Sequence, residues 1–285
     1  MVNGSVVFVP GSRSRVHRED PVSTVPSDRP SSGPRSVELS VVIPAHNSAA
    51  VIESTVNAFA DYLGNRDAEI IVVENGSTDE TAHVCDKLLN GWSGPVRLIV
   101  IASTKGMGNA LRTGIARSVG ARVLLTADDL PFGFDDLDGA YRHTGGLPPV
   151  AIGSKAHSAS VVQRGLARSV LTRGFTALRR IVLGTRTKDP QGTFLVDGLL
   201  LRALAPALTE PGFLFTTELD YAVELAGLRP LELPVRLSAS HRDQPSRVAG
   251  SDIVAMGRGL LALRSRRAEL LEAATSAGAG ARPTN

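Results

Sequence analysis

Two adjacent carboxylates follow a short apolar segment near the middle of the chain. Residues 123–126 read Val-Leu-Leu-Thr and run through Ala127 into Asp128 and Asp129. Such an apolar run is typical of a buried parallel strand, and open α/β sheets bind ligands at the carboxyl ends of their strands. Carboxylate oxygens there could hold Mg²⁺ or Mn²⁺. A solvated turn that ends a strand explains this stretch, taken alone, at least equally well.

Polar residues also follow two earlier apolar segments. Residues 39–44 lead to Asn47, and residues 68–73 lead to Glu74. Because the carboxyl ends of parallel strands share one edge of a sheet, we expect these side chains and Asp129 to line a single crevice. Short polar side chains there can bind a nucleobase and a ribose. A turn-forming asparagine and a solvated loop acid are the alternatives for the single residues, but the set at three strand ends favours a site.

A glycine-rich turn precedes the helix that we expect over residues 110–119. Gly106 and Gly108 flank Met107 in this turn, and Asn109 follows. Glycines before a helix can let backbone N–H groups approach a phosphate. The turn is neither a dinucleotide-binding fingerprint nor a P-loop, so by itself it is weak evidence.

These positions require strands that alternate with helices, and the apolar spacing predicts such an order. Alternation of this kind indicates right-handed crossovers and a mostly parallel sheet. The expected strands cover residues 39–44, 68–73, 96–101, 123–126, 149–154, 193–196 and 231–237. The expected helices cover residues 48–63, 79–89, 110–119, 134–143, 161–183, 199–208, 217–226 and 256–274.

Composition narrows the class of protein. The chain has 285 residues, 42% hydrophobic content and a formal net charge of +3, as expected of a soluble globular protein. Its aromatic content of 4% argues against stacking on nucleic acid. No apolar run approaches the length of a spanning helix. The single cysteine, Cys85, excludes an internal disulfide and is compatible with a cytoplasmic location.

Three blocks of the sequence resemble the opening of the family 2 inverting glycosyltransferases. They are Ser-Val-Val-Ile-Pro-Ala-His-Asn at 40–47, Val-Val-Glu-Asn-Gly-Ser-Thr-Asp at 72–79 and Gly-Met-Gly-Asn-Ala-Leu-Arg at 106–112. Softer similarities at 153–155, 189–194 and 218–219 resemble the polyprenyl-phosphate (dolichyl-phosphate-type) glucosyl- and mannosyltransferase branch. The resemblance implies the GT-A fold, a Rossmann-like three-layer α/β sandwich with a mostly parallel central sheet.

On this basis we divide the chain into three parts. Residues 1–36 are rich in Ser, Pro and Arg and are expected to form a disordered tail. Residues 37–250 are expected to form the GT-A glycosyltransferase domain. Residues 251–285 are expected to form a C-terminal helix and a loose tail.

The resemblance also implies roles for particular residues. Asp129 matches the last carboxylate of the family's metal-binding D-x-D motif, and Glu218, with Asp220 nearby, matches an acid that faces the acceptor and could act as the base. The residues expected to bind the sugar nucleotide or a phosphate are Pro44, Ala45, Asn47, Glu74, Gly76, Ser77, Gly106, Gly108, Asn109, Asp128, Lys155, Gln191 and Arg247. The implied cofactor is Mg²⁺ or Mn²⁺.

The sequence departs from the family pattern at three places. Ala127 stands where D-x-D has its first carboxylate, Glu74-Asn75 replaces an Asp-Asp pair, and Met107 replaces a lysine. Successive side chains on an extended segment point to opposite faces, so we expect Asp128 not to join Asp129 on a metal. The metal shell should therefore be thinner than in the family pattern.

The expected activity is transfer of a sugar, with inversion, from a nucleoside-diphosphate sugar to a phosphate or polyprenyl phosphate. A phosphate acceptor arrives ionised and needs no strong base. The alternatives are a soluble small-molecule acceptor and a non-catalytic sugar-nucleotide-binding protein. Five arginines lie in the expected helix over 161–183. They could bind a phosphate or rest on an anionic membrane, which would place the protein peripherally at the inner face, or they could form a solvated basic face.

Overall fold

The fold is built on one seven-stranded sheet, seen in a computed structural model that describes residues 37–161, 166–238 and 250–280. The strand order is β3-β2-β1-β4-β6-β5-β7. All neighbouring strands are parallel except β6, which runs antiparallel to β4 and β5. The predicted α/β class with a mostly parallel central sheet is therefore confirmed. The strands are β1 Leu39–Ala45, β2 Ala68–Glu74, β3 Arg97–Ala102, β4 Arg122–Leu125, β5 Val150–Ser154, β6 Thr193–Asp197 and β7 Leu231–Pro234.

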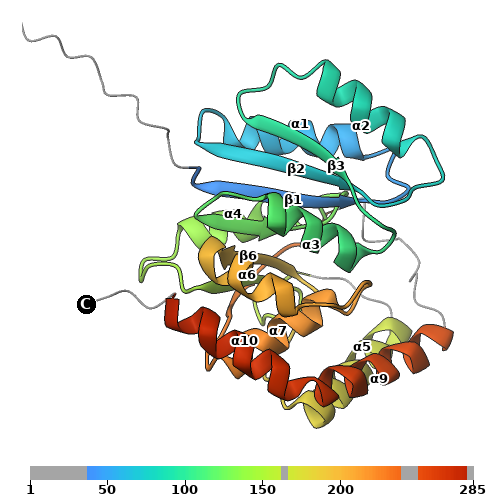
Figure 1. Cartoon of the computed structure of the whole chain (residues 1–285), viewed down its shortest axis with the longest axis vertical. Coiled ribbons are helices and arrows are strands. Elements are labelled where there is room, and N and C mark those ends of the chain that lie inside the picture. The colour runs from blue at the N-terminus through green and yellow to red at the C-terminus, as the bar shows by residue number, and fades with distance from the viewer. Residues whose placement is uncertain (1–36, 162–165, 239–249, 281–285) are drawn as a thin grey trace, which may run out of the picture. The chain divides into compact units, whose positions relative to one another are not determined.

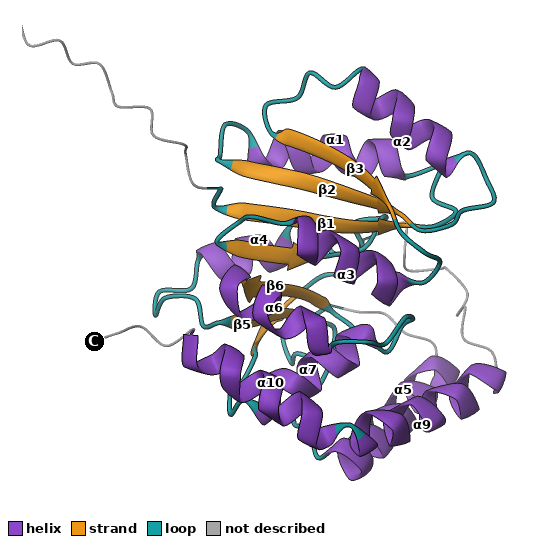
Figure 2. Cartoon of the chain, in the orientation of Figure 1, coloured by secondary structure: helices purple, strands orange, loops and turns teal. Residues whose placement is uncertain are grey.

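Helices cover both faces of this sheet (Figure 1; Figure 2). The helices are α1 Ile52–Leu63, α2 Thr81–Asn90, α3 Met107–Arg117, α4 Asp135–Tyr141, α5 Leu166–Leu183, α6 Gly198–Leu204, α7 Phe215–Leu225, α9 Gly250–Ser265 and α10 Arg267–Gly280, with a 3₁₀ turn at Ala205–Ala207. One apolar core packs α1, α2 and α4 on one face, and a second packs α3, α6, α7, α9 and α10 on the other. The result is the predicted three-layer arrangement.

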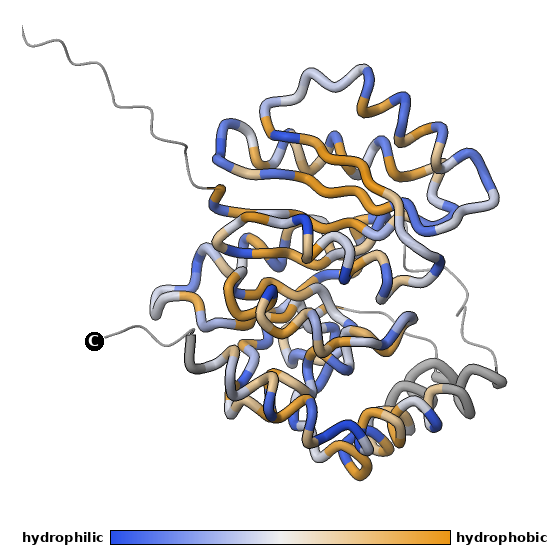
Figure 3. Tube along the Cα trace, in the orientation of Figure 1, coloured by the Kyte–Doolittle hydropathy of each residue, from blue (hydrophilic) through white to orange (hydrophobic). Residues whose placement is uncertain are grey.

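The central strands are apolar on both faces, as buried parallel strands must be (Figure 3). Every residue of β1 is buried. Alternate residues of the strand contribute to different cores: Val42 packs with α3, whereas Val41 and Ile43 pack with α1. This double burial fixes the strand, and with it the position of the residues that follow Ala45.

Small residues allow one helix to lie close to the sheet. A Cβ atom added at Gly114 of α3 would come within 2.3 Å of the Val42 side chain. Cys85 is buried on α2, and burial raises the pKa of its thiol to about 11. The thiol is therefore protonated near neutral pH.

The structure corrects several expected boundaries. The helix expected over 256–274 is two helices that meet at Arg266, and α10 continues to Gly280, so the residues from 276 to 280 are helical and not a loose tail. Val161, where the helix over 161–183 was expected to begin, pairs instead with Arg236 in a β-bridge, and α5 covers Leu166–Leu183. None of the helices in the described ranges combines the length and the apolar character that crossing a membrane requires.

Candidate active site at the strand ends

The strand register brings most of the predicted site residues to one edge of the sheet. Ala45 pairs with Glu74, and Glu74 pairs with Ala102, so β1, β2 and β3 end together. β4 ends beside them, and the antiparallel β6 begins there. β5 ends at the start of β6. This strand-end site gathers Asn47, Glu74, Gly76, Ser77, Gly106, Gly108, Asn109, Asp128, Asp129, Lys155 and Gln191.

The connections after β1 and β2 bind each other. The Asn47 Oδ1 atom accepts a hydrogen bond of 2.8 Å from the Thr78 backbone N–H, and the Asn47 N–H donates to Ser77 Oγ at 3.1 Å. Asn47 has φ 54°, a left-handed conformation that is uncommon outside glycine and is enriched near functional sites. Both connections are thereby held in one arrangement.

Glu74 is held as a carboxylate at the end of β2. Burial acts to raise the pKa of Glu74, but hydrogen bonds from Ser77 and from the Gly76 backbone outweigh it and hold the pKa below its usual value. The Ser77 N–H lies 2.6 Å from Glu74 Oε1. The side chain stays half-exposed, so an ionised acceptor faces the strand-end site. Such a group can accept hydrogen bonds from a base or a ribose.

Pro44 and Ala45 contribute to the site through the backbone. Both residues are buried, and Ala45 belongs to a hydrophobic core. The Ala45 carbonyl accepts a hydrogen bond of 3.0 Å from the Asn75 N–H. The Asn75 side chain is 2% exposed, and its Oδ1 atom has no hydrogen-bond partner among the described residues.

Asp128 is half-exposed and makes two hydrogen bonds within the protein. Its carboxylate accepts a hydrogen bond from Ser48 Oγ, and its backbone carbonyl accepts one from Thr55 Oγ1 at 2.7 Å. Leu130, two residues on, has φ 46°. The chain therefore turns sharply after β4, with Asp128 directed to the start of α1.

The described residues supply few metal ligands. No group of three His, Cys, Asp or Glu side chains in 37–161, 166–238 and 250–280 is placed to hold a metal ion. Mg²⁺ is commonly held by one or two carboxylates together with substrate phosphates and water. The half-exposed Asp129, which follows β4, is chemically suited to that second kind of site.

The glycine-rich turn is packed against a segment from the second half of the chain. The Pro211 carbonyl accepts hydrogen bonds from the N–H groups of Gly108 and Asn109, at 2.9 and 3.3 Å. A Cβ atom at Gly108 would lie 2.0 Å from the Glu210 carbonyl oxygen. Glycine is required here by the approach of protein backbone, and a phosphate reaches these two N–H groups only when the Pro211 carbonyl moves away.

Lys155 and Gln191 lie together at the ends of β5 and β6. The Lys155 Nζ atom lies 3.4 Å from the Gln191 carbonyl oxygen and 3.9 Å from an Asp189 carboxylate oxygen. The Lys155 N–H donates to the same carboxylate at 2.8 Å. Asp189 therefore orients the lysine and offsets part of its charge.

The two predicted catalytic acids are both buried on α7. Glu218 Oε1 lies 2.5 Å from Arg266 Nη1, and Glu218 Oε2 accepts a hydrogen bond of 2.8 Å from the Glu210 N–H. Asp220 is paired with Arg179 at 3.2 Å, and neither side chain is exposed. In this structure neither carboxylate is exposed to solvent.

Burial raises the pKa of Asp220 to about 7. A hydrogen bond from Thr187 and the charge of Arg179 act to lower it, whereas the carboxylates of Glu224 and Glu232 add to the rise. The Arg179 guanidinium also contacts Thr185 Oγ1 and the Thr187 carbonyl. The pair thus ties α5 and α7 to the segment that leads to Asp189.

Two residues for which phosphate binding was considered lie outside the described part of the chain: Arg247 and Arg164 of the arginine-rich helix. The backbones of Arg168 and Arg173 lie in α5.

The sequence analysis missed Ser48, Asp189 and Arg266. Ser48 directly follows the block at 40–47, and its hydroxyl donates to Asp128, so pairing the strand ends could have suggested it. Asp189 lies in the block at 189–194, whose resemblance to the polyprenyl-phosphate branch assigns it no role. No local sequence pattern predicts the contacts of Arg266, because the residues that it binds lie 48 to 59 positions earlier in the chain.

Comparisons with known proteins agree with this arrangement. Residues 40–196 match the family Glycosyl transferase family 2. The chain is 31% identical to human dolichyl-phosphate beta-glucosyltransferase over 173 residues, which cover 55% of this chain and 53% of the human protein. It is 29% identical to the mouse protein of that name over 255 residues, which cover 80% of this chain and 75% of that one. The match thus spans about half the length of the human relative.

Solved structures show the same fold. Glucosyl-3-phosphoglycerate synthase from Mycobacterium tuberculosis, solved in complex with uridine diphosphate, superposes with a TM-score of 0.57 at 22% identity, covering 81% of this chain and 80% of that one. Its fold is GT-A, as predicted for this chain. The chain belongs to glycosyl transferase family 2. Within it, the chain is similar to the dolichyl-phosphate beta-glucosyltransferases, so the predicted resemblance to the polyprenyl-phosphate branch is confirmed.

Proposed function

We propose that the chain transfers a sugar, with inversion, from a uridine-diphosphate sugar to the phosphate of a polyprenyl-phosphate-type acceptor. The observation that carries this proposal is the convergence of Asn47, Glu74, Asp129 and Lys155 at one edge of the sheet. Membership of family 2 and the names of the relatives, which are glucosyltransferases acting on dolichyl phosphate, support the reaction class and the acceptor.

In this proposal different strand ends bind different parts of the donor. Asn47, Glu74 and Ser77 bind the nucleoside, since they form one connected polar group at the ends of β1 and β2. Lys155 and Gln191 lie at the ends of β5 and β6, where a cation can bind the oxygens of a phosphate.

A divalent cation would be held by Asp129 and by the diphosphate of the donor. When bound, Mg²⁺ or Mn²⁺ supplies charge stabilisation for the departing nucleoside diphosphate. Structural neighbours have been solved with Mn²⁺ or with Mg²⁺ and uridine diphosphate, which supports the kind of ion. The chain's own part is to place Asp129 beside the polar strand ends.

The proposal assigns no general base to this reaction. An acceptor phosphate oxygen is ionised near neutral pH and attacks the anomeric carbon directly, while the bond from that carbon to the diphosphate oxygen breaks. The uridine diphosphate leaves with the electron pair. Glu218 and Asp220 are buried and paired with arginines, which favours a structural role for both.

A peripheral membrane contact through α5 and α9 is a further part of the proposal. On α5, Ile181 is 80% exposed and Leu178 is 37% exposed, and on α9 Leu261 is 60% exposed. Arg180 and Arg264 are exposed on the same two helices, which pack together. Exposed apolar side chains beside arginines are typical of interfacial helices. Flotation with anionic vesicles should fall in Ile181→Ser/Leu261→Ser; equal flotation would exclude this contact.

Transfer assays test the central proposal. The chain is incubated with Mg²⁺, a polyprenyl phosphate and each of several radiolabelled sugar nucleotides, and label in the organic phase is measured. We expect label from a uridine-diphosphate sugar, and its loss with a chelator. Donor binding without turnover on any acceptor would instead identify a non-catalytic sugar-nucleotide-binding protein. Turnover on water-soluble acceptors alone would contradict the polyprenyl assignment.

A further inference from the structure

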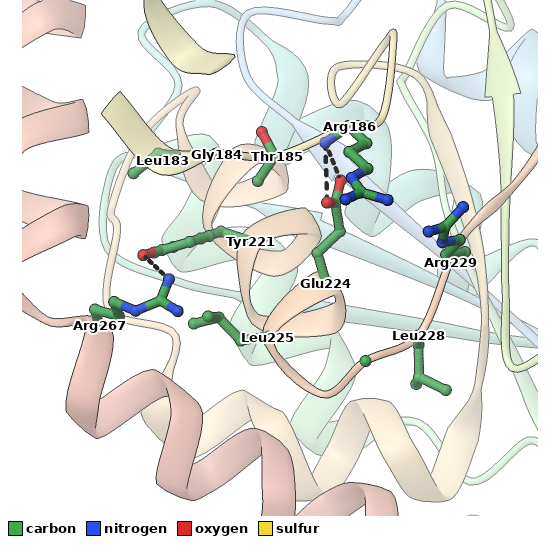
Figure 4. Close-up of a pocket in the computed structure, with 11 residues that line it drawn as sticks. Leu183, Gly184, Thr185, Arg186, Tyr221, Glu224, Leu225, Leu228, Arg229 and Arg267 are labelled. Carbon is green, nitrogen blue, oxygen red and sulfur yellow. Dashed lines mark hydrogen bonds between the residues drawn. The ribbon is translucent and has the colours of Figure 1, made fainter. Parts of the chain in front are cut away.

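A cavity lies away from the strand ends, beside the C-terminal half of α7. Its volume is about 350 Å³, which is within the range of ligand sites. The end of α5, the segment that follows it and the start of α10 complete its walls (Figure 4). Its lining residues are Leu183, Gly184, Thr185, Arg186, Tyr221, Glu224, Leu225, Gly227, Leu228, Arg229 and Arg267. None of them belongs to the strand-end site.

The cavity is basic, because Arg186, Arg229 and Arg267 face a single acid, Glu224. Three positive charges against one negative charge leave a net charge of +2. The Arg186 and Arg229 guanidinium groups make no hydrogen bond or ion pair with any described residue. Two cations in one cavity therefore have no anionic partner in the described part of the chain.

Glu224 does not neutralise these arginines directly. Its carboxylate accepts hydrogen bonds from the Arg186 N–H at 2.7 and 2.9 Å and from the Thr187 N–H at 2.8 Å (Figure 4 shows the first two). The acid is thus used to hold the backbone of the segment after α5. The side-chain donors of Arg186 remain available to a ligand.

Further donors lie at the opposite end of the cavity. Arg267 Nη1 donates to the Tyr221 hydroxyl oxygen at 3.3 Å, and Tyr221 is 1% exposed. Arg267 is also the first residue of the 14-residue helix α10, whose amino end carries partial positive charge. Leu183, Leu225 and Leu228 supply apolar surface between the two ends.

We propose that this basic cavity binds a phosphate-bearing ligand, with Arg186, Arg229 and Arg267 donating to its oxygens. Planar guanidinium groups bind phosphate in pairs of hydrogen bonds, and several together select a group that carries more than one negative charge. The ligand is either a free phosphate compound or the head group of an anionic phospholipid. The exposed Ile181, two residues before Leu183, lies on the helix that ends at the cavity.

A ligand here would also touch the segment that leads to the strand-end site. Arg186 is three residues before Asp189, so their Cα atoms are at most about 11 Å apart. Asp189 in turn holds Lys155. A ligand in the cavity would therefore contact a segment whose other end carries part of the proposed diphosphate site.

The test compares wild type with Arg186→Gln/Arg229→Gln, and with Arg117→Gln as a matched control. Arg117 is an exposed arginine on α3, far in sequence from the cavity. Inorganic pyrophosphate is titrated into each protein by calorimetry at constant ionic strength, with saturating uridine diphosphate present to fill the proposed donor site. In a second arm, phosphatidylcholine vesicles with and without phosphatidylglycerol replace the pyrophosphate.

We expect the double variant to bind pyrophosphate at least tenfold more weakly than wild type and Arg117→Gln, because it loses the charge-assisted hydrogen bonds of two guanidinium groups. The same loss in the vesicle arm alone would assign the cavity to a lipid head group. Equal binding by all three proteins in both arms would overturn the site. Because binding and not turnover is measured, this result is independent of whether the chain transfers sugar.

Discussion

Acidic residues at the strand ends and acidic residues on α7 are held in opposite ways. Glu74 and Asp128 stay half-exposed and are bound by hydroxyl and backbone donors from neighbouring connections. Glu218 and Asp220 are fully buried and paired with Arg266 and Arg179. The difference separates two uses of a carboxylate: the strand-end acids can meet a ligand, whereas the α7 acids join helices from distant parts of the chain.

If this comparison is correct, the largest effect on stability comes from the most deeply buried pair. Replacing Arg179 by methionine leaves Asp220 buried without its cation, which costs about 3–5 kcal/mol. Urea unfolding followed by circular dichroism measures the change. The double variant Arg179→Met/Asp220→Leu removes both charges and should recover most of the loss. Equal destabilisation by the single and the double variant would show that the ion pair is not the cause.

Arg266 should have the next largest effect. It contacts Glu218, Thr209 and the Ala207 carbonyl and thereby fastens the C-terminal helices to the segment beside the glycine-rich turn. Arg266→Met should cost about 2–3 kcal/mol, because it leaves the buried Glu218 with a single donor. Glu269→Gln, which alters only an exposed partner of Arg266, is the control and should change the free energy of unfolding by less than about 0.5 kcal/mol.

The raised pKa of Asp220 predicts a smaller, pH-dependent effect. With a folded pKa of about 7, the folded chain keeps a proton that the unfolded chain releases above about pH 4. The free energy of unfolding of wild type should therefore fall relative to that of Asp220→Asn as the pH rises from about 4 to about 7, and stay level above. A level profile across this window, with a rise confined to below about pH 4, would mean that Arg179 dominates and lowers the pKa instead.

Ser48 at the strand ends should matter least for folding. Ser48→Ala removes the hydroxyl that donates to Asp128 and accepts from the His46 N–H, and each lost hydrogen bond of this kind costs about 1 kcal/mol. Thermal unfolding would measure it, with Ser54→Ala on the exposed face of α1 as the control. A loss as large as that of Arg179→Met would remove the distinction between the two regions.

The sequence predicted the strand-end region well because short-range rules decide it. Apolar runs such as 39–44 and 68–73 become buried parallel strands, and the residues after them must share one edge. The surroundings of Glu218 could not be predicted in this way. Its partner Arg266 lies 48 residues away at a helix break that no local pattern indicates. The contacts of the glycine-rich turn could not be predicted either, because its N–H groups bond to the Pro211 carbonyl, about 100 residues later in the chain.

The most direct test of the account is a calorimetric titration of uridine diphosphate, with Mg²⁺, into wild type, Asp129→Asn and Glu218→Gln. If the strand ends bind the donor, Asp129 is a ligand-binding carboxylate and Glu218 has a structural role. This assignment predicts that Asp129→Asn weakens the binding of uridine diphosphate at least tenfold and abolishes the effect of Mg²⁺. Changes to the residues around a metal typically weaken metal binding about 10–100-fold. Glu218→Gln should bind like wild type once corrected for the folded fraction. Normal binding by Asp129→Asn together with lost binding by Glu218→Gln would contradict it.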